Sequence, residues 1–218
     1  AQTERTPSTA KFDYFFQEAI RQKQLSHYDA AIDLFNYCHT LDPKSGAALF
    51  ELSSLFRYAN NDSLATKALE LASKLYPDNF WYKSNLVMRY LSENRTDEAL
   101  ERVVEMSKQF PEKSEVLMML LDLYEKKNDY DNMVKVLDKI EVKEGKSEQL
   151  SMEKFRIFLQ KGDEKRAFDE MKDLADEYPN DLRYKVVIGD LYLHAGRKDE
   201  ALKQYKSVED IDSTNVTL

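Results

Sequence analysis

The sequence predicts an all-α protein built from about six helix-turn-helix repeats, or about twelve helices. Three observations support this prediction. Four of the five prolines lie 34 or 68 residues apart, at Pro43, Pro77, Pro111 and Pro179. An alanine keeps the 34-residue step at Ala31, Ala65, Ala99, Ala167 and Ala201. An aromatic residue keeps it at Phe56, Tyr90, Tyr124, Phe158 and Tyr192. Such a period is typical of proteins in which one supersecondary unit stacks on the next.

The same step sets the expected repeat boundaries, near 12–45, 46–79, 80–113, 114–147, 148–181 and 182–215. Within each repeat, apolar residues recur at steps of three and four, which indicates two amphipathic helices. Asn or Gly near the middle of a repeat favours a tight turn between them. The series puts Gly145 and Ser213 where other repeats have proline, so we expect the helices to end there as well.

With this alanine, aromatic and proline pattern, the chain resembles tetratricopeptide (TPR) repeat proteins over almost its whole length. The resemblance implies an α-α superhelix, a right-handed solenoid of helix pairs. We expect residues 1–218 to form a single domain that is truncated at its C-terminal end, because no further helix follows to cover Leu202 and Tyr205. Bulky Leu121 and Phe155 replace the small residue that the family prefers at the eighth repeat position.

Composition narrows the classes of partner. The net charge is −8 at pH 7, so the chain lacks the basic excess from which nucleic-acid affinity arises, and we expect no nucleic-acid binding. No apolar run approaches the roughly 18 residues of a membrane-spanning helix, so we expect no membrane insertion. A protein or peptide is the expected partner.

The start of the chain bears on its compartment. It begins at Ala1 with the polar stretch AQTERTPSTA, as expected of a mature end after signal-peptide removal, or equally of a trimmed chain. The repeats also resemble exported TPR proteins of the bacterial envelope. We therefore expect a periplasmic or otherwise exported protein, with the cytoplasm as the alternative. The single cysteine, Cys38, does not separate the two.

In the TPR family the ligand groove is lined by the second, fifth, ninth, twelfth and thirteenth residues of the first helix of each repeat. Carried over to this chain, these positions give a candidate groove of large apolar and cationic residues: Phe16, Ile20, Phe50, Tyr58, Trp81, Met88, Leu91, Met118, Met152, Arg156 and Arg183. Exposed methionines and aromatic residues suit an adaptable peptide-binding surface. The Lys and Asn pattern with which some TPR domains clamp an acidic C-terminal tail is missing, so an apolar or mixed segment is the better ligand.

The alternative for part of this set is a role in the core. Phe16, Phe50 and Met118 could contact the neighbouring helix, because an apolar helical stripe usually means burial. Trp81 could close the turn between two repeats instead of facing a ligand.

The sequence shows no constellation of catalytic residues, so we expect a protein that is not an enzyme and has no cofactor. His27, His39 and His194 are far apart in the repeat frame. Cys38 occupies a small apolar helix position, which favours the core over a nucleophile. No glycine-rich phosphate loop and no close set of metal ligands occurs, so we expect no metal site.

The leading hypothesis is therefore a non-catalytic scaffold that binds a peptide or partner domain in the groove. One alternative is a structural or assembly module that works through the ends of the solenoid, including a homo-oligomer formed through the C-terminal end. Another is an accessory domain of a longer protein.

Overall fold

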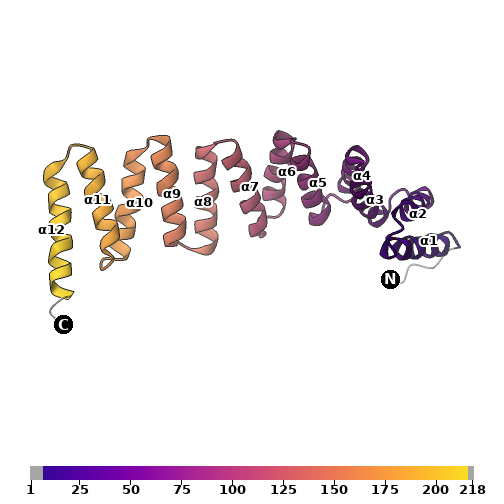
Figure 1. The fold of residues 1–218 in the computed structure, drawn as a ribbon, viewed down its shortest axis with the longest axis horizontal. Helices are drawn as coiled ribbons and strands as arrows, with labels where there is room; N and C mark the ends of the chain where they lie inside the picture. Colours follow the sequence, from indigo (N-terminus) through magenta and orange to yellow (C-terminus); the bar gives the residue numbers. More distant parts are fainter. Residues whose placement is uncertain (1–6, 216–218) are drawn as a thin grey trace. The chain divides into compact units, whose positions relative to one another are not determined.

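The structure is a computed structural model that describes residues 7–215, with side chains from residue 8 to residue 212. Twelve α-helices and no strand occur in that range (Figure 1). In chain order they are α1 (Pro7–Gln24), α2 (Tyr28–Leu41), α3 (Gly46–Tyr58), α4 (Asp62–Leu75), α5 (Phe80–Ser92), α6 (Thr96–Gln109), α7 (Ser114–Lys126), α8 (Tyr130–Glu144), α9 (Glu148–Lys161), α10 (Glu164–Glu177), α11 (Leu182–His194) and α12 (Lys198–Asn215).

The helix boundaries confirm the predicted repeat register. From the second repeat on, the first helix of each repeat starts at the expected residue: Gly46, Phe80, Ser114, Glu148 and Leu182. The second helices keep the same step in all six repeats. We call the first helix of a repeat helix A and the second helix B. All-α architecture with consecutive helix pairs is thus confirmed.

Two boundaries differ from expectation. Helix α1 begins at Pro7 and so starts ahead of the expected repeat start near residue 12. Proline is well suited to a first helical position, where its missing N–H would have no intrahelical partner. Helix α12 continues through Ser213 to Asn215, so the expected break at Ser213 was wrong. Serine, unlike proline, keeps its N–H and can continue a helix. Gly145 does end α8, with φ +93°.

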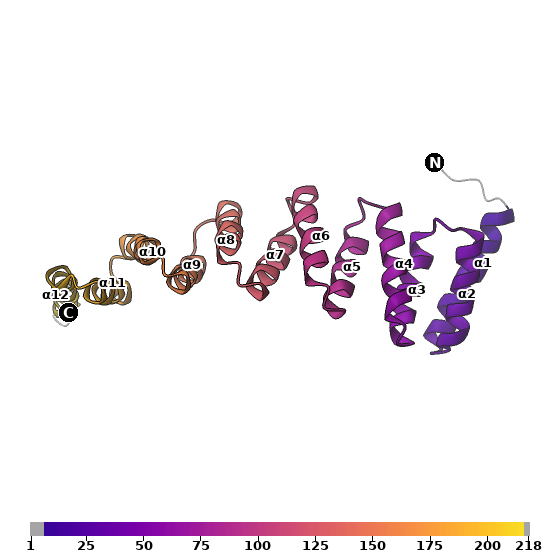
Figure 2. The ribbon, with the colours of Figure 1, turned by 90° about the horizontal axis from the view of Figure 1, so that it is seen from above.

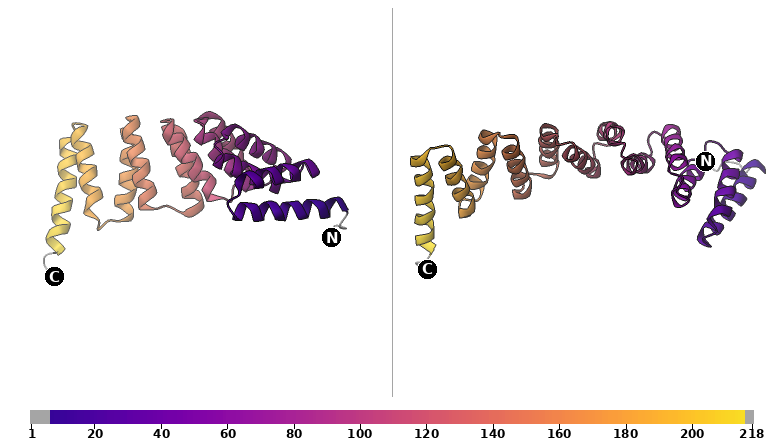
Figure 3. Two further views of the ribbon diagram at one scale, coloured as in Figure 1. Left: turned by 45° about the vertical axis from the view of Figure 1, so that its right-hand side comes forward. Right: turned by 45° about the horizontal axis from the view of Figure 1, so that its top comes forward.

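The helices form two compact units, Ala1–Val116 and Leu117–Leu218, which divide within α7. Consecutive helices from α1 to α6 in the first unit, and from α8 to α12 in the second, pack as antiparallel neighbours, for example α3 on α4 and α11 on α12 (Figures 2 and 3). The expected single domain over residues 1–218 stays a prediction.

The turn inside each repeat is fixed by one left-handed residue. The six residues with this geometry lie at the same repeat position, with φ between +52° and +76°: Ser26, Asn60, Asn94, Asn128, Gly162 and Gly196. Glycine and asparagine tolerate this conformation best because a Cβ meets the neighbouring backbone there. Serine in the first repeat is the exception.

Helix starts are fixed by polar caps. A side-chain oxygen accepts a backbone N–H two or three residues on at Ser45, Asn61, Asn79, Asp129, Ser147, Asp163 and Asp181. Each such cap satisfies an N–H that has no partner within the helix, and typically stabilises by about 1 kcal/mol.

Small residues in the core of the first unit allow close contact between the two helices of the second repeat. The Ser53 hydroxyl of α3 donates a 2.7 Å hydrogen bond to the Ala65 carbonyl of α4, and both residues are buried. The expected contact between Ala65 and the surface of α3 around Ser53 is therefore present. Cys38 is fully buried, as expected for a core residue.

Polar contacts tie the second repeat to the third. Arg89 of α5 is buried and pairs with Asp62 at the start of α4, at 2.7 Å. The Thr66 hydroxyl of α4 donates to the Glu93 carboxylate that follows α5. These contacts join successive repeats at the turn edge of the stack.

An ion cluster replaces apolar packing in the second unit. Lys154 of α9 takes the repeat position that Ile188 fills in the next repeat, and its side chain is 7% exposed. Its amine lies 2.8 Å from Asp138 and 2.7 Å from Glu141 of α8, and 3.7 Å from Glu170 of α10. Desolvation lowers the pKa of Lys154, but the hydrogen bonds to the two α8 carboxylates outweigh it and raise that pKa overall. Burial raises the pKa of Glu170.

The left-handed serine gives a first prediction. Ser26→Gly should raise the free energy of unfolding of the first unit by about 0.5–1 kcal/mol, because glycine adopts positive φ without the Cβ clash. Urea unfolding followed by circular dichroism measures this change. Asn94→Ala is the matching change in the opposite direction, because it places a residue that disfavours positive φ at the same repeat position. It should lower the free energy of unfolding by a similar amount. A Ser26→Gly variant that is less stable than the natural chain would contradict the steric argument.

The ion cluster gives a second prediction. Lys154→Met should lower the unfolding free energy by about 3 kcal/mol near neutral pH, because it leaves the partly buried Glu141 and Glu170 carboxylates without their cation. In the variant, the pKa of the Glu170 carboxyl group, which burial already raises, rises further in the folded state because Lys154 no longer lowers it. The folded state then binds more protons than the unfolded chain, and stability falls as pH rises. The deficit should therefore be smaller at about pH 5 than at about pH 8.

The control for this cluster is Lys146→Met, which removes an exposed pair with Asp173 at 3.3 Å. Such a surface pair contributes at most about 1 kcal/mol. The explanation would be contradicted if the two variants lost equal amounts of unfolding free energy. It would also be contradicted if the loss in Lys154→Met did not depend on pH.

Candidate functional site

The candidate groove positions share one side of each helix A. Steps of three and four residues return to nearly the same direction on a helix of 3.6 residues per turn. On α5 this side carries Trp81, Ser84, Met88 and Leu91. Large apolar residues exposed along one such side are candidates for contact with a partner.

Trp81 and Met88 are the most exposed candidates of the first unit, at 67% and 61%. The Trp81 indole meets the Phe80 ring edge-on at 5.5 Å, and Phe80 in turn packs against Phe110 at 5.4 Å. Phe80 is buried. The indole is therefore held by a core residue beneath it while most of its own surface faces outward.

Tyr58 lies at the end of α3 and is 59% exposed. Its ring stacks on that of Tyr28 at 5.3 Å with an interplanar angle of 6°. The neighbouring Arg57 guanidinium lies 5.8 Å from the Tyr58 ring centroid. This arrangement presents two aromatic rings and a cation at the turn edge of the first two repeats.

Four other candidates of the first unit are half-buried. Phe16 and Ile20 of α1 pack against the core cluster around Phe35, and the Phe16 and Phe35 rings are 5.4 Å apart. Phe50 lies 5.9 Å from the Tyr82 ring. Leu91 is half-buried as well. Phe16, Ile20 and Phe50 thus combine a contact with the core and a partly exposed surface.

In the second unit the exposed apolar candidates are Met118 at 51% and Met152 at 40%. Leu159 and Leu193, at equivalent positions further along α9 and α11, are 42% and 51% exposed. Met118 therefore does not take the core role considered for it.

The two cationic candidates already have carboxylate partners. Arg183 lies 2.5 Å from Asp181 and 3.2 Å from Glu148, and its hydrogen bond to Asp181 raises its pKa. Arg156 pairs with Glu153 and approaches Glu125 at 3.8 Å. Their charges are largely balanced, which weakens them as sites for an acidic ligand.

Sequence reasoning missed a cavity of about 440 Å³ at the junction of α7, α8 and α9. Met118, Leu121, Leu137, Ile140 and Leu150 supply its apolar lining. The chain crosses here through Gly145 instead of a proline turn. The missing proline was the signal that could have drawn attention to this junction.

A metal site and a reactive thiol each place requirements on the described residues. No cluster of three or more His, Cys, Asp or Glu side chains that could hold a metal ion occurs among the described residues. Burial raises the pKa of the Cys38 thiol, which keeps it in its unreactive form. In the part of the chain that the structure describes, no helix is both long and apolar enough to span a membrane.

Comparisons with known proteins agree with this geometry. A tetratricopeptide repeat family model matches residues 152–216, and another matches residues 114–140. A comparison with curated protein sequences finds no match.

Solved structures share the fold. A tetratricopeptide repeat protein from Parabacteroides merdae has a TM-score of 0.58 and 18% identity, over 91% of this chain and 79% of that one. The structure of Naa15/Naa10 bound to HypK-THB contains a chain with a TM-score of 0.65 and 20% identity, over 91% of this chain and 31% of that one. A MamA structure from Desulfovibrio magneticus has a TM-score of 0.51 and 11% identity, over 94% of this chain and 96% of that one.

The 34-residue register of twelve helices, the two family matches and these structural neighbours lead to one conclusion. The chain is a tetratricopeptide repeat protein with an all-α superhelix fold.

Proposed function

We propose that this protein is a non-catalytic scaffold that binds a peptide or a segment of a partner protein along the groove side of its A helices. The observation that carries this proposal is the exposure of large apolar residues at the groove positions. Trp81, Met88 and Met118 are each more than half exposed. Charged residues make up 33% of the chain, so a shortage of polar side chains does not explain why large apolar ones are exposed here. A contiguous set of exposed apolar residues indicates a binding surface.

The groove side of α3 and α5 in the first unit is nearly free of charge. Among the groove positions of α3 and α5, Arg57 alone is charged. The others are aromatic, aliphatic or small, and include the half-buried Phe50 beside Tyr58. An apolar or mixed segment suits such a surface, and buried aromatic contacts are the common hot spots of protein interfaces.

The fold supports binding with little reorganisation. Helix A residues are held by the repeat stack, so the scaffold side of the interface loses little conformational freedom on binding. Methionines such as Met88 and Met152 add unbranched, polarizable side chains that adapt to different ligands. The similar chain in the Naa15/Naa10 structure belongs to a protein complex, which is in line with a binding role for such an array.

The groove proposal gives a third prediction. Peptides selected from a displayed random library on the immobilised protein should carry bulky apolar side chains, because these match Trp81 and Met88. Combined Trp81→Ala and Met88→Ala should weaken their binding about 30-fold, the effect of losing one hot spot of about 2 kcal/mol. Fluorescence anisotropy with a labelled selected peptide measures the loss.

The matched control is Leu71→Ala, which truncates an exposed residue of helix B in the same unit. It should leave the affinity unchanged. Selected peptides that bind the Trp81 and Met88 double variant as tightly as the natural chain would rule out this groove as their site.

A further inference from the structure

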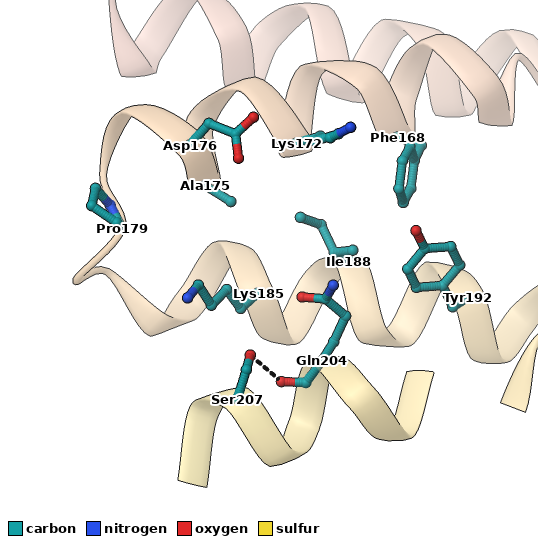
Figure 4. Close-up of a pocket in the computed structure, with 10 residues that line it drawn as sticks. All are labelled: Phe168, Lys172, Ala175, Asp176, Pro179, Lys185, Ile188, Tyr192, Gln204 and Ser207. Atoms are coloured by element: carbon teal, nitrogen blue, oxygen red, sulfur yellow. Dashed lines mark hydrogen bonds between the residues drawn. The ribbon is translucent and has the colours of Figure 1, made fainter. Parts of the chain in front are cut away.

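A second hollow lies among the B helices of the last two repeats. It has a volume of about 390 Å³ and is formed by α10, α11 and α12 (Figure 4). We call it the helix-B cleft. Its lining residues are Phe168, Lys172, Ala175, Asp176, Pro179, Lys185, Ile188, Tyr192, Gln204 and Ser207. This volume is within the usual range of ligand pockets.

The helix-B cleft is separate from the groove. Its α11 residues include Lys185 and Ile188, whereas the groove positions of that helix include Arg183 and Val186. Each member of the first pair follows its counterpart by two residues, a rotation of about 200° around the helix. The two surfaces therefore lie on opposite sides of α11.

The floor of the cleft is apolar. Ile188 lies at its centre, and the Phe168 and Tyr192 rings close one end with their centroids 5.0 Å apart (Figure 4). The same two rings line a second cavity of about 440 Å³ that continues to Leu159 and Leu191. An apolar side chain larger than a methyl group can therefore be received beside the aromatic pair.

The rim of the cleft carries two lysines, although the second unit as a whole is acidic. Lys172 of α10 and Lys185 of α11 line the cleft, and neither amine lies within 4.0 Å of a carboxylate among residues 8–212. Asp176 is the single acidic lining residue. By contrast, the unit from residue 117 to residue 218 carries 18 Lys and Arg against 23 Asp and Glu. The charge of the cleft thus has the opposite sign to that of its unit.

Polar groups of α12 complete the rim. The Ser207 hydroxyl donates a 2.7 Å hydrogen bond to the backbone carbonyl of Gln204. The Gln204 side-chain amide is directed over the cleft, on the side of Ile188 and Tyr192 (Figure 4). It supplies N–H donors to a ligand acceptor.

The preceding pair of repeats is built differently at the equivalent position. Where Ile188 forms the floor here, the equivalent residue one repeat earlier is Lys154, whose amine is held by Asp138, Glu141 and Glu170. The three carboxylates belong to the flanking B helices and are paired with this lysine. No such internal ion cluster balances Lys172 and Lys185.

We propose that the helix-B cleft binds an acidic amphipathic peptide segment of a partner protein. One bulky apolar side chain of the segment lies on Ile188 between the aromatic pair and α12. Carboxylates that flank it pair with Lys172 and Lys185, and a backbone carbonyl accepts from the Gln204 amide. Charge complementarity selects this class of partner over a basic one.

The test uses the full chain labelled with ¹⁵N and a short, acetylated and amidated peptide in which Glu and Leu alternate. We expect saturable shifts of amide signals from α10, α11 and α12. Charge reversal by Lys172→Glu with Lys185→Glu should weaken binding by at least about tenfold, the effect of about 1.4 kcal/mol. The matched control, Lys203→Glu with Lys206→Glu, makes the same change of net charge on α12 outside the cleft and should keep the affinity within about twofold.

Two comparison peptides separate the two parts of the proposal. A peptide of alternating Lys and Leu should not bind the cleft, and one of alternating Glu and Ser should bind far more weakly than the Glu and Leu peptide. The proposal is overturned if the Glu and Leu peptide does not saturate, if the Lys and Leu peptide binds equally well, or if both double variants lose affinity equally. Shifts confined to groove residues such as Met152 and Leu193 would also overturn it.

Discussion

Close contact between the two helices of one repeat is the constraint on which the rest of the structure depends. A single helix pair has an apolar side that it cannot bury by itself, and stacking on the next pair is what covers it. In the second repeat, Ser53 allows this contact and adds a hydrogen bond to the Ala65 carbonyl. In the last repeat, Gly189 has the same role, because a Cβ there would lie 2.6 Å from the Tyr205 ring.

The same constraint divides the residues of each repeat into those that hold the stack and those that are left free. Small and apolar residues at the contact positions fix the helices, and the left-handed residue of each turn fixes the reversal between them. Positions such as Trp81 and Met88 contribute little to this packing, and their exposed surfaces are available for binding. The stability of the array and its choice of partner therefore rest largely on different residues.

The repeat pattern predicted the helix pairs, their register and most of their boundaries, because contacts in such a fold are local and recur at a fixed step. The repeat pattern places the candidate groove residues on one side of each helix A but does not predict their exposure: Trp81 faces outward while Phe16 packs against the core. That difference depends on the neighbouring side chains of other helices. The helix-B cleft escaped the sequence pattern for the same reason, since its residues come from three helices and share no motif.

One repeat position shows how such an array acquires individual surfaces. At the seventh residue of helix A, Ile188 and Lys154 occupy equivalent places on successive repeats. The lysine is tolerated because three carboxylates from the flanking B helices pair with it. The isoleucine needs no such partners, so the flanking B helices can carry other side chains, among them Lys172. A single exchange in the core thus changes which charges the outer helices must supply, and through them what the surface presents to a partner.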